Sequence, residues 1–425
     1  MLAAATAAML AALAIASAAS AATVEIRREN LFGPASVREV LAVVDGGAED
    51  NELSAHIVGE TAGEFEMQVI DRIAALTPGP GCQGGGAPIS IVTCLIHKPG
   101  PEIEVGFRFD LGGGHNFFEA SNLAFPLTYR GGDGKDVVVT GFGDDTIEPG
   151  AGEDNVHGNP GNDLLLVPAA ADVGNRYDLS QGFDTVSYAA RTVPIHLRGK
   201  TVETNGSRDE LEAVENLIGG NAADTFEDIW LPGTYPAPAI PQIEAGPGDD
   251  LLEGGVSGIR LLGGPGDDTL TGGDDALVPP GLKGAPPRGT NSLIGGEGDD
   301  LAYGASARDV IELGEGNDTA YAGASNDRLD GGVGKDFLDG DDGDDLVIGD
   351  AGSDRLLGGS GKDRLFAARK VKAGDRNPLA AGPFDWRDQL GCGPDRDWAV
   401  ANPWDTRRGC ERVALKPLPK HHVRR

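Results

Sequence analysis

Residues 331–339 read GGVGKDFLD, and variants of these nine residues follow one another without a gap from 295 to 366. The variants share an aspartate at the sixth place and an apolar residue at the eighth. Most have glycine at the second and fourth places. A fixed period of this kind indicates a repeat architecture. The sixth-place residues of this block are Asp300, Asp309, Asp318, Asp327, Asp336, Asp345, Asp354 and Asp363.

Each nonad divides into a turn and a short strand. Glycines among its first six residues permit positive φ and close backbone approach, so the turn can aim carbonyl oxygens at the sixth-place carboxylate. The last three residues predict a strand whose middle side chain, Leu338 in the copy quoted above, points inward. Two nonads complete a flattened coil, so that equivalent turns and strands stack at every second repeat.

Stacked turns pile carboxylates coil upon coil, and these repel unless a cation lies between them. Calcium takes six to eight oxygen ligands in flexible geometry. Residues 295–366 contain no Cys or His that would favour zinc, copper or iron. They hold 18 acids and 6 bases, a net charge of −12. Pairing each nonad with the next but one allows at most six sandwiched sites, whose divalent ions would cancel that charge.

Two shorter blocks repeat the theme. We predict a first block at 129–166, a second at 244–276 with Ile259 in one aspartate place, and a third at 295–366. An insert at 167–243 contains a partial repeat and a short helix expected around Asp209–Asn216. Residues 277–294, rich in Pro and Gly, are expected to be a linker.

The pattern GGxGxDxUx, where U is a large apolar residue, resembles the RTX or haemolysin-type calcium-binding repeat. The resemblance implies an all-β fold, a parallel β-roll, with multiple Ca²⁺ ions held by sixth-place aspartates and turn carbonyls of neighbouring coils. The implied ligands are Asp136, Asp145, Asp154, Asp163, Asp250, Asp268, Asp300, Asp309, Asp318, Asp327, Asp336, Asp345, Asp354 and Asp363. Two alternatives are a solenoid that needs no metal and an EF-hand at 339–350, which lacks the required glycine at its sixth position.

Some turns depart from the pattern. Strain there would weaken binding if φ is positive, so we expect weaker sites at Asp309 and Asp327 than at Asp336 and Asp363. Fifth-place aspartates such as Asp299 and Asp344 are expected to face solvent. The non-glycine residues are Ala307 and Ser325 at the fourth place, and Ala305, Asp341 and Asp350 at the second.

Both ends of the chain differ in character from the repeats. Residues 1–22 are apolar and end in small residues, which indicates a signal peptide, although no Lys or Arg precedes the run. A membrane anchor is the alternative. Residues 23–128 predict a small β domain with a disulfide between Cys82 and Cys94. It ends in a degenerate repeat that has Asn116 in the aspartate place. Residues 367–425 predict a C-terminal cap, with Trp386, Trp398 and Trp404 over the last coil, and a basic tail. Cys392 and Cys410 could form a second disulfide; free thiols or zinc are the alternatives.

Composition narrows the function. Acids outnumber bases 67 to 35, giving a net charge of −32, which opposes binding to nucleic acid and to anionic membrane surfaces. Disorder is the alternative reading of such a chain, but 40% hydrophobic content and the periodic pattern oppose it.

The sequence lacks GxSxG, HExxH and GxxxxGK[ST] motifs. We therefore expect a secreted calcium-binding protein that is not an enzyme and whose roll folds on calcium. An exported hydrolase with its activity in 23–243, and a calcium-dependent surface adhesin or matrix protein, are alternatives.

Overall fold

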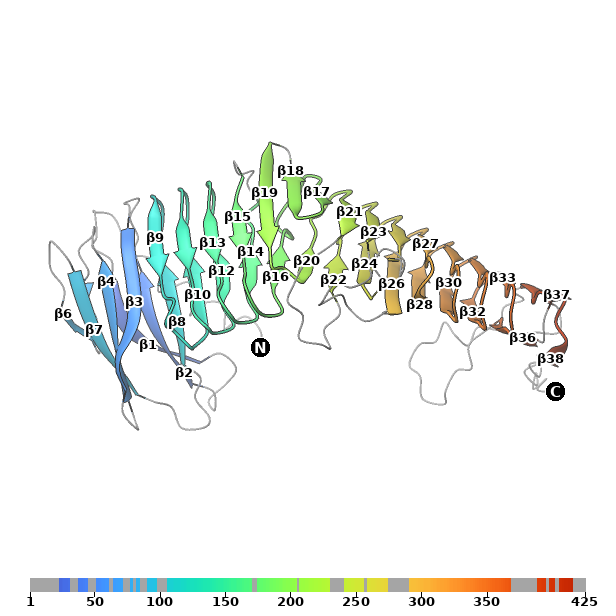
Figure 1. The fold of residues 1–425 in the computed structure, drawn as a ribbon, viewed down its shortest axis with the longest axis horizontal. Helices are drawn as coiled ribbons and strands as arrows, with labels where there is room; N and C mark the ends of the chain where they lie inside the picture. Colours follow the sequence, from blue (N-terminus) through green and yellow to red (C-terminus); the bar gives the residue numbers. More distant parts are fainter. Residues whose placement is uncertain are drawn as a thin grey trace, which may run out of the picture. The chain divides into compact units, whose positions relative to one another are not determined.

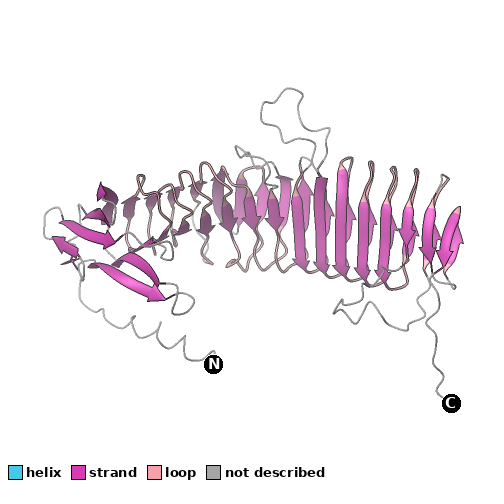
Figure 2. Ribbon diagram, turned by 90° about the horizontal axis from the view of Figure 1, so that it is seen from below, coloured by secondary structure: helices cyan, strands magenta, loops and turns pink. Residues whose placement is uncertain are grey.

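The computed structural model divides into two units, 1–184 and 185–425. Figure 2 draws strands as the regular elements of the described residues, and among these residues no helix is long and apolar enough to cross a membrane. The described residues are 23–30, 37–44, 51–60, 64–71, 77–78, 82–84, 90–97, 105–169, 174–204, 206–229, 241–255, 258–273, 290–367, 388–394, 397–401 and 405–415.

The second unit is a parallel β-roll with two sheets, whose strands follow one another as labelled in Figure 1. One sheet consists of β16 (Thr185–Ser187), β20 (Asn216–Ile218), β22 (Gln242–Glu244), β24 (Arg260–Pro265), β26 (Thr290–Glu297), β28 (Arg308–Glu315), β30 (Arg328–Val333), β32 (Leu346–Ala351), β34 (Arg364–Phe366), β36 (Trp398–Ala401) and β38 (Arg412–Leu415). Neighbours in it pair in parallel.

The other sheet runs through alternate strands of the chain and is parallel apart from the antiparallel strands β18 (Thr201–Thr204) and β19 (Ser207–Glu212). Its strands are β17 (His196–Arg198), β21 (Thr225–Ile229), β23 (Leu251–Gly254), β25 (Thr269–Thr271), β27 (Leu301–Tyr303), β29 (Thr319–Tyr321), β31 (Phe337–Asp339), β33 (Arg355–Leu357), β35 (Gln389–Gly391) and β37 (Thr406–Arg408). Phe337 pairs with Arg355, eighteen residues further on, which confirms the coil of two nonads.

The interior of the roll is a thin ladder of eighth-place side chains. Strand alternation turns these residues inward, while their neighbours on either side face outward. All eight from the longest block are fully buried, as the pattern predicts: Ala302, Ile311, Ala320, Leu329, Leu338, Val347, Leu356 and Leu365. The stability of the roll therefore comes from contacts between adjacent coils rather than from one large core.

The structure contradicts the expected helix and the last part of the expected linker in this unit. The first half of the expected helix is strand β19 (Ser207–Glu212), which pairs antiparallel with β18 (Thr201–Thr204), and buried and exposed residues alternate along it. Residues 290–294 of the expected linker belong to β26, and residues 277–289 lie outside the described residues. The described residues of the expected cap form strands β35 to β38, which continue both sheets; Trp398 faces outward on β36 against Phe366, with ring centroids 5.2 Å apart. Trp386 and Trp404 lie outside the described residues.

The first unit begins with antiparallel strands that lead into parallel sheets. In one sheet, β5 (Thr77–Pro78), β1 (Thr23–Asn30) and β2 (Val37–Val44) precede the parallel run β8 (Val105–Asp110), β10 (Leu127–Arg130), β12 (Thr146–Glu148) and β14 (Leu164–Leu166). In the other, β6 (Cys82–Gly84), β7 (Ser90–His97), β4 (Glu64–Asp71) and β3 (Asn51–Glu60) precede β9 (Asn116–Glu119), β11 (Val137–Val139), β13 (Asn155–His157) and β15 (Arg176–Asp178).

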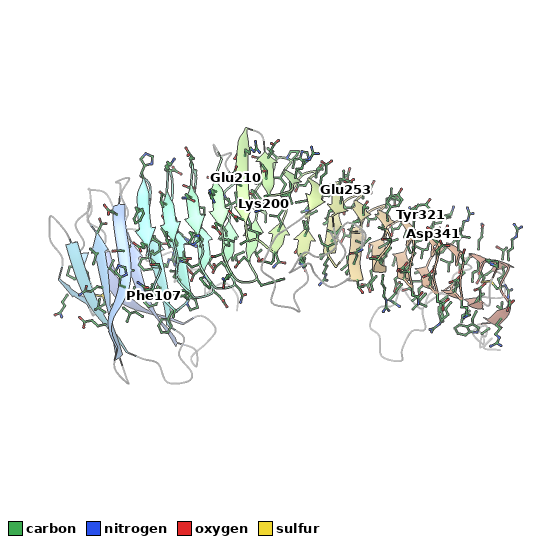
Figure 3. All side chains as sticks on the ribbon, in the orientation of Figure 1. Phe107, Lys200, Glu210, Glu253, Tyr321 and Asp341 are labelled. Carbon is green, nitrogen blue, oxygen red and sulfur yellow. A yellow bond between two sulfur atoms is a disulfide. The ribbon has the colours of Figure 1, made fainter. Side chains whose placement is uncertain are left out.

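Aromatic side chains fill the first coils of this unit. Phe109 lies 4.6 Å from Phe118 between ring centroids, and Phe118 lies 5.0 Å from Tyr129. Phe107 is also buried and is labelled in Figure 3. A disulfide joins Cys82 on β6 to its cross-strand neighbour on β7. The predicted β domain thus shares its sheets with the first repeat block.

Candidate metal-binding turns

The sixth-place aspartates of the second unit form two ladders. In each, the backbone N–H of one aspartate donates to Oδ1 of the aspartate in the next coil, over 2.6 to 3.1 Å. We call the first ladder Asp224, Asp250, Asp268, Asp300, Asp318, Asp336, Asp354, Asp388 and Asp405. We call the second ladder Asp309, Asp327, Asp345, Asp363 and Asp397.

The first unit has shorter ladders of the same kind. The N–H of Asn116 donates to Asp136, that of Asp136 to Asp154, and that of Asp154 to Asn175. The other runs through Asp145, Asp163 and Asp184. Every aspartate predicted as a ligand therefore belongs to a ladder, and Asn116 stands in an aspartate place as expected.

In most of these aspartates, the second carboxylate oxygen, Oδ2, takes no part in the ladder. The predicted ligands are at most 4% exposed, so each charge has been taken out of water. In nine of them Oδ2 is buried and has no hydrogen-bond partner in the structure: Asp163, Asp250, Asp268, Asp300, Asp318, Asp327, Asp336, Asp345 and Asp354. Buried polar atoms normally have a partner, so these oxygens point to a positively charged ligand.

Burial also makes the carboxylates hard to ionise. It raises the pKa of Asp268 to about 8, and the carboxylates of Asp250 and Asp300 act in the same direction. Burial raises the pKa of Asp354 to about 8 and that of Asp163 to about 9. Hydrogen bonds from backbone N–H groups oppose these shifts without overcoming them. At neutral pH the turns thus need either protons or a cation.

The first-place glycines leave room where oxygen atoms converge. A Cβ built on Gly340 would lie 2.6 Å from both Asp345 Oδ2 and the carbonyl oxygen of Gly358 in the next coil. Equivalent positions on Gly295 and Gly331 face Asp300 and Asp336 in the same way. A side chain would fill this space, so the glycine keeps open a cradle of carboxylate and carbonyl oxygens.

These donors fit a hard cation. Calcium accepts a mixture of carboxylate and backbone carbonyl oxygens at 2.3–2.6 Å. Within the described ranges, no group of three or more His, Cys, Asp or Glu side chains is placed to hold a metal. Each turn would therefore rely on one or two carboxylates supplemented by carbonyl groups, a set that suits calcium better than zinc.

In three ladder aspartates, unlike the nine named above, protein groups already satisfy Oδ2. The Tyr129 hydroxyl donates to Asp136 over 3.2 Å. Backbone N–H groups donate to Asp145 over 3.1 Å and to Asp224 over 2.7 Å. These contacts occupy the oxygen that a cation would use, so we regard the three turns as structural.

Sequence reasoning missed five ladder aspartates. Each immediately precedes a short strand with an inward apolar residue, or in one case Arg407, at its middle, but none follows a full glycine-rich turn. That local signal, an aspartate just before a strand of three to five residues, would have found them. They are Asp184, Asp224, Asp388, Asp397 and Asp405.

The fifth-place aspartates face solvent, as predicted. Asp299 and Asp344 are exposed, and their Oδ1 atoms accept from the N–H groups of Asn317 and Lys362 in the next coil. Their exposure to water makes them weaker candidates for a cation than the buried sixth-place residues.

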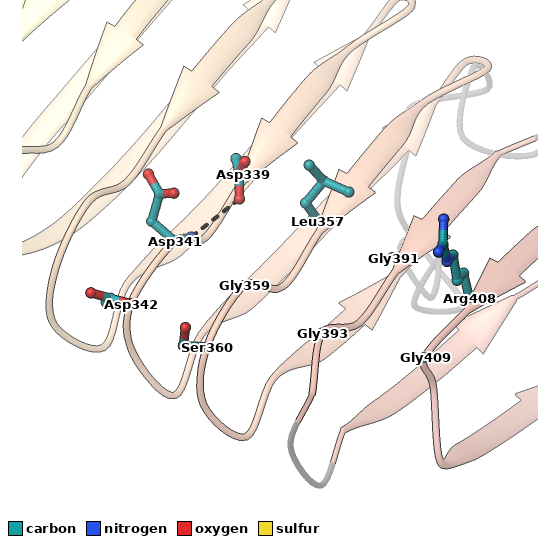
Figure 4. A pocket seen from close by; sticks show the side chains of 10 residues that line it. All are labelled: Asp339, Asp341, Asp342, Leu357, Gly359, Ser360, Gly391, Gly393, Arg408 and Gly409. Atoms are coloured by element: carbon teal, nitrogen blue, oxygen red, sulfur yellow. Dashed lines mark hydrogen bonds between the residues drawn. The ribbon is translucent and has the colours of Figure 1, made fainter.

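A groove of about 480 Å³ crosses the turns near the end of the second unit (Figure 4). Asp339, Asp341 and Asp342 line one part of it and Arg408 another. Gly391 also lines the groove and lies between Leu357 and Arg408 on neighbouring strands. Its carboxylates are exposed or half-buried, unlike those of the ladders, so we do not assign a metal to it.

Parallel sheets, eighteen-residue coils and buried aspartate ladders define a β-roll with cation-binding turns. The family model of the RTX calcium-binding nonapeptide repeat matches residues 130–165, 260–276, 288–320, 303–338, 313–347 and 339–369. The chain therefore carries several copies of the RTX calcium-binding nonapeptide repeat. Of the fourteen predicted aspartates, only Asp250 lies outside the matched segments. No curated protein matches the chain.

Proposed function

We propose that this chain is a secreted, non-enzymatic protein whose roll folds as several calcium ions bind between stacked turns. The observation that carries the proposal is the set of nine buried Oδ2 atoms that have no hydrogen-bond partner. Folding without a cation would bury these charges close together, at a large cost in free energy. Binding of calcium would therefore be coupled to folding.

Two chemical features support the export of this protein: its disulfides and the calcium concentration that its sites would need. Both cysteine pairs form disulfides, and disulfides persist in oxidising compartments. Extracellular calcium modules typically bind with dissociation constants of roughly 10⁻⁴–10⁻³ M. A chain that requires such calcium concentrations would remain unfolded in a low-calcium cytosol and would fold after export.

A structural role for the N-terminal part is supported by its strand pairing. Strand β2 pairs with β8, and β3 pairs with β9, so this part extends the same sheets as the repeats. It would protect the first coil from edge-to-edge association. This arrangement favours a covering element over a separate catalytic domain.

The test is far-UV circular dichroism of the whole chain in calcium-free buffer during titration with calcium. We expect β content to rise with calcium and to saturate with several ions bound, counted by native mass spectrometry. Magnesium at equal concentration should have a much smaller effect. Unchanged β content and an unchanged melting temperature after removal of calcium would refute the proposal.

A further inference from the structure

We propose that the Asp363 turn holds the last calcium ion of the second ladder, with the backbone carbonyl of Cys392 as one ligand, and that the Cys392–Cys410 disulfide holds this carbonyl in position. The inference rests on the proposed calcium function. It extends the sites into residues beyond 369, where the matched repeats end.

The turn at 358–363 is hydrogen-bonded at both ends to the next coil, at Gly391 and at Asp397. The N–H of Asp363 donates to Asp397 Oδ1 over 3.0 Å. The N–H of Gly358 donates to the carbonyl of Gly391 over 2.8 Å. The two turns are thus neighbours in the roll, although 34 residues separate Asp363 from Asp397.

The same oxygen cradle recurs between these two turns. A Cβ built on Gly358 would lie 2.5 Å from Asp363 Oδ2 and 2.8 Å from the carbonyl oxygen of Cys392. One coil earlier, Asp345 Oδ2 and the carbonyl of Gly358 converge in this way over Gly340. The Cys392 carbonyl therefore occupies the position that the carbonyl of a first-place glycine occupies inside the repeat block.

Cys392 also ends the series of open oxygen cradles along the second ladder. It stands at the first place of its turn, where the repeats have glycine, so its own Cβ occupies the space that a cradle for Asp397 would need. Its side chain is fully buried, and its disulfide partner lies 4.9 Å away between Cα atoms. The second ladder thus continues to Asp397 as a hydrogen-bonded structure, but its last open cradle belongs to Asp363.

The disulfide fixes the backbone that carries this ligand. Cys392 N–H donates to the carbonyl of Arg408 over 3.0 Å, and the disulfide adds a covalent link to the same turn. In Figure 4, Gly391 and Gly393 mark the turn around Cys392, and Gly409 marks the turn that leads to Cys410. Without the covalent link, a turn flanked by two glycines has more backbone freedom, and the carbonyl loses its fixed position.

The experiment counts calcium ions and measures their affinities in the full chain. Native mass spectrometry and calorimetry would compare the wild type with Cys392→Ser/Cys410→Ser. We expect the loss of one ion, or a weakening of one site by roughly 10- to 100-fold, the range for outer contacts that orient a ligand. The control is Cys82→Ser/Cys94→Ser, which removes the disulfide of the first unit and should leave these values unchanged.

Asp363→Asn in the oxidised protein provides a second variant if the cysteine variant folds poorly. It should lose the same ion, and combining it with Cys392→Ser/Cys410→Ser should cause no further loss. Independent, additive losses would overturn the inference, as would full calcium binding by the cysteine variant. If the wild type itself binds no calcium, the proposed function fails instead.

Discussion

The backbone N–H of Asp318 donates a hydrogen bond to Oδ1 of Asp336, 3.0 Å away in the next coil. That bond uses one carboxylate oxygen to join two coils. The other oxygen of Asp336, Oδ2, remains buried without a partner. One side chain therefore serves both the fold and the cation, which explains why aspartate recurs where asparagine alone would satisfy the backbone.

Replacing Asp336 by asparagine separates these two roles. The amide oxygen of the new side chain can still accept from the N–H of Asp318, and its N–H₂ group faces carbonyl oxygen rather than repelling carboxylates. We expect Asp336→Asn to stabilise the calcium-free protein by about 1 kcal/mol and to reduce the number of bound ions. Thermal melts and native mass spectrometry, with and without calcium, would measure both effects. Asp299→Asn, at an exposed fifth place, is the control and should change neither; equal effects of the two variants would contradict the assignment.

The dependence of stability on pH should reverse when calcium is added. Burial raises the pKa of Asp268 and Asp354 to about 8, far above the ordinary value of 3.8. Between these values the folded, calcium-free chain holds more protons than the unfolded chain, so its stability falls as pH rises. Calcium needs the ionised carboxylates, so its affinity should rise over the same range. Urea unfolding at pH 5 and pH 8 tests this, and a calcium-free protein that is more stable at pH 8 would disprove it.

The repeated turns were predictable because glycine, aspartate and an inward apolar residue recur at fixed places. The parallel strands, the coil length and the burial of residues such as Leu338 all follow from that period. The period also located fourteen of the ladder aspartates between Asp136 and Asp363, although not Asp184 and Asp224.

Where the nine-residue period is interrupted, the local sequence was insufficient to predict which residues continue the ladders. Asp388 and Asp405 continue the first ladder, but neither stands at the sixth place of a nonad in the sequence, so their register depends on strand pairing. The fully buried Arg191 had no signature in a stretch without repeats. The hydroxyl of Tyr129 on Asp136 depends on contact between adjacent coils, which spacing alone does not reveal.

Fourth-place glycines are required by close contact between turns. Gly334 has φ of 154°, and a Cβ there would overlap the carbonyl of Gly316 in the preceding coil. Gly334→Ala should therefore destabilise the calcium-bound protein by about 3 kcal/mol, measured by urea unfolding. Gly206 also has positive φ but has nothing within 4 Å of an added Cβ. Gly206→Ala should cost only about 1 kcal/mol, and similar losses in the two variants would argue against close packing.

Ser325 should be a source of strain in the Asp327 turn. Its φ is 108°, a conformation that glycine adopts far more readily than serine. Ser325→Gly should stabilise the protein by about 1 kcal/mol and tighten calcium binding at that turn. The exposed Ser360, at the third place of another turn, does not have positive φ, so Ser360→Gly should be neutral or destabilising. A loss of stability or of calcium affinity in Ser325→Gly would show that its side chain, which donates to Ser306 O over 3.0 Å, matters more than the backbone.

The Tyr129–Asp136 contact provides a test of which ladder aspartates bind calcium. Because the hydroxyl occupies Asp136 Oδ2, Asp136→Asn should leave the number of bound calcium ions unchanged, whereas Asp336→Asn should lower it. Tyr129→Phe removes the donor from a buried carboxylate and should destabilise the calcium-free protein by roughly 1–3 kcal/mol. Calcium should restore part of that loss in Tyr129→Phe if the vacated oxygen accepts a cation. Native mass spectrometry of the three variants decides the matter: loss of an ion in Asp136→Asn would mean that hydrogen bonding of Oδ2 does not distinguish structural turns from calcium-binding ones.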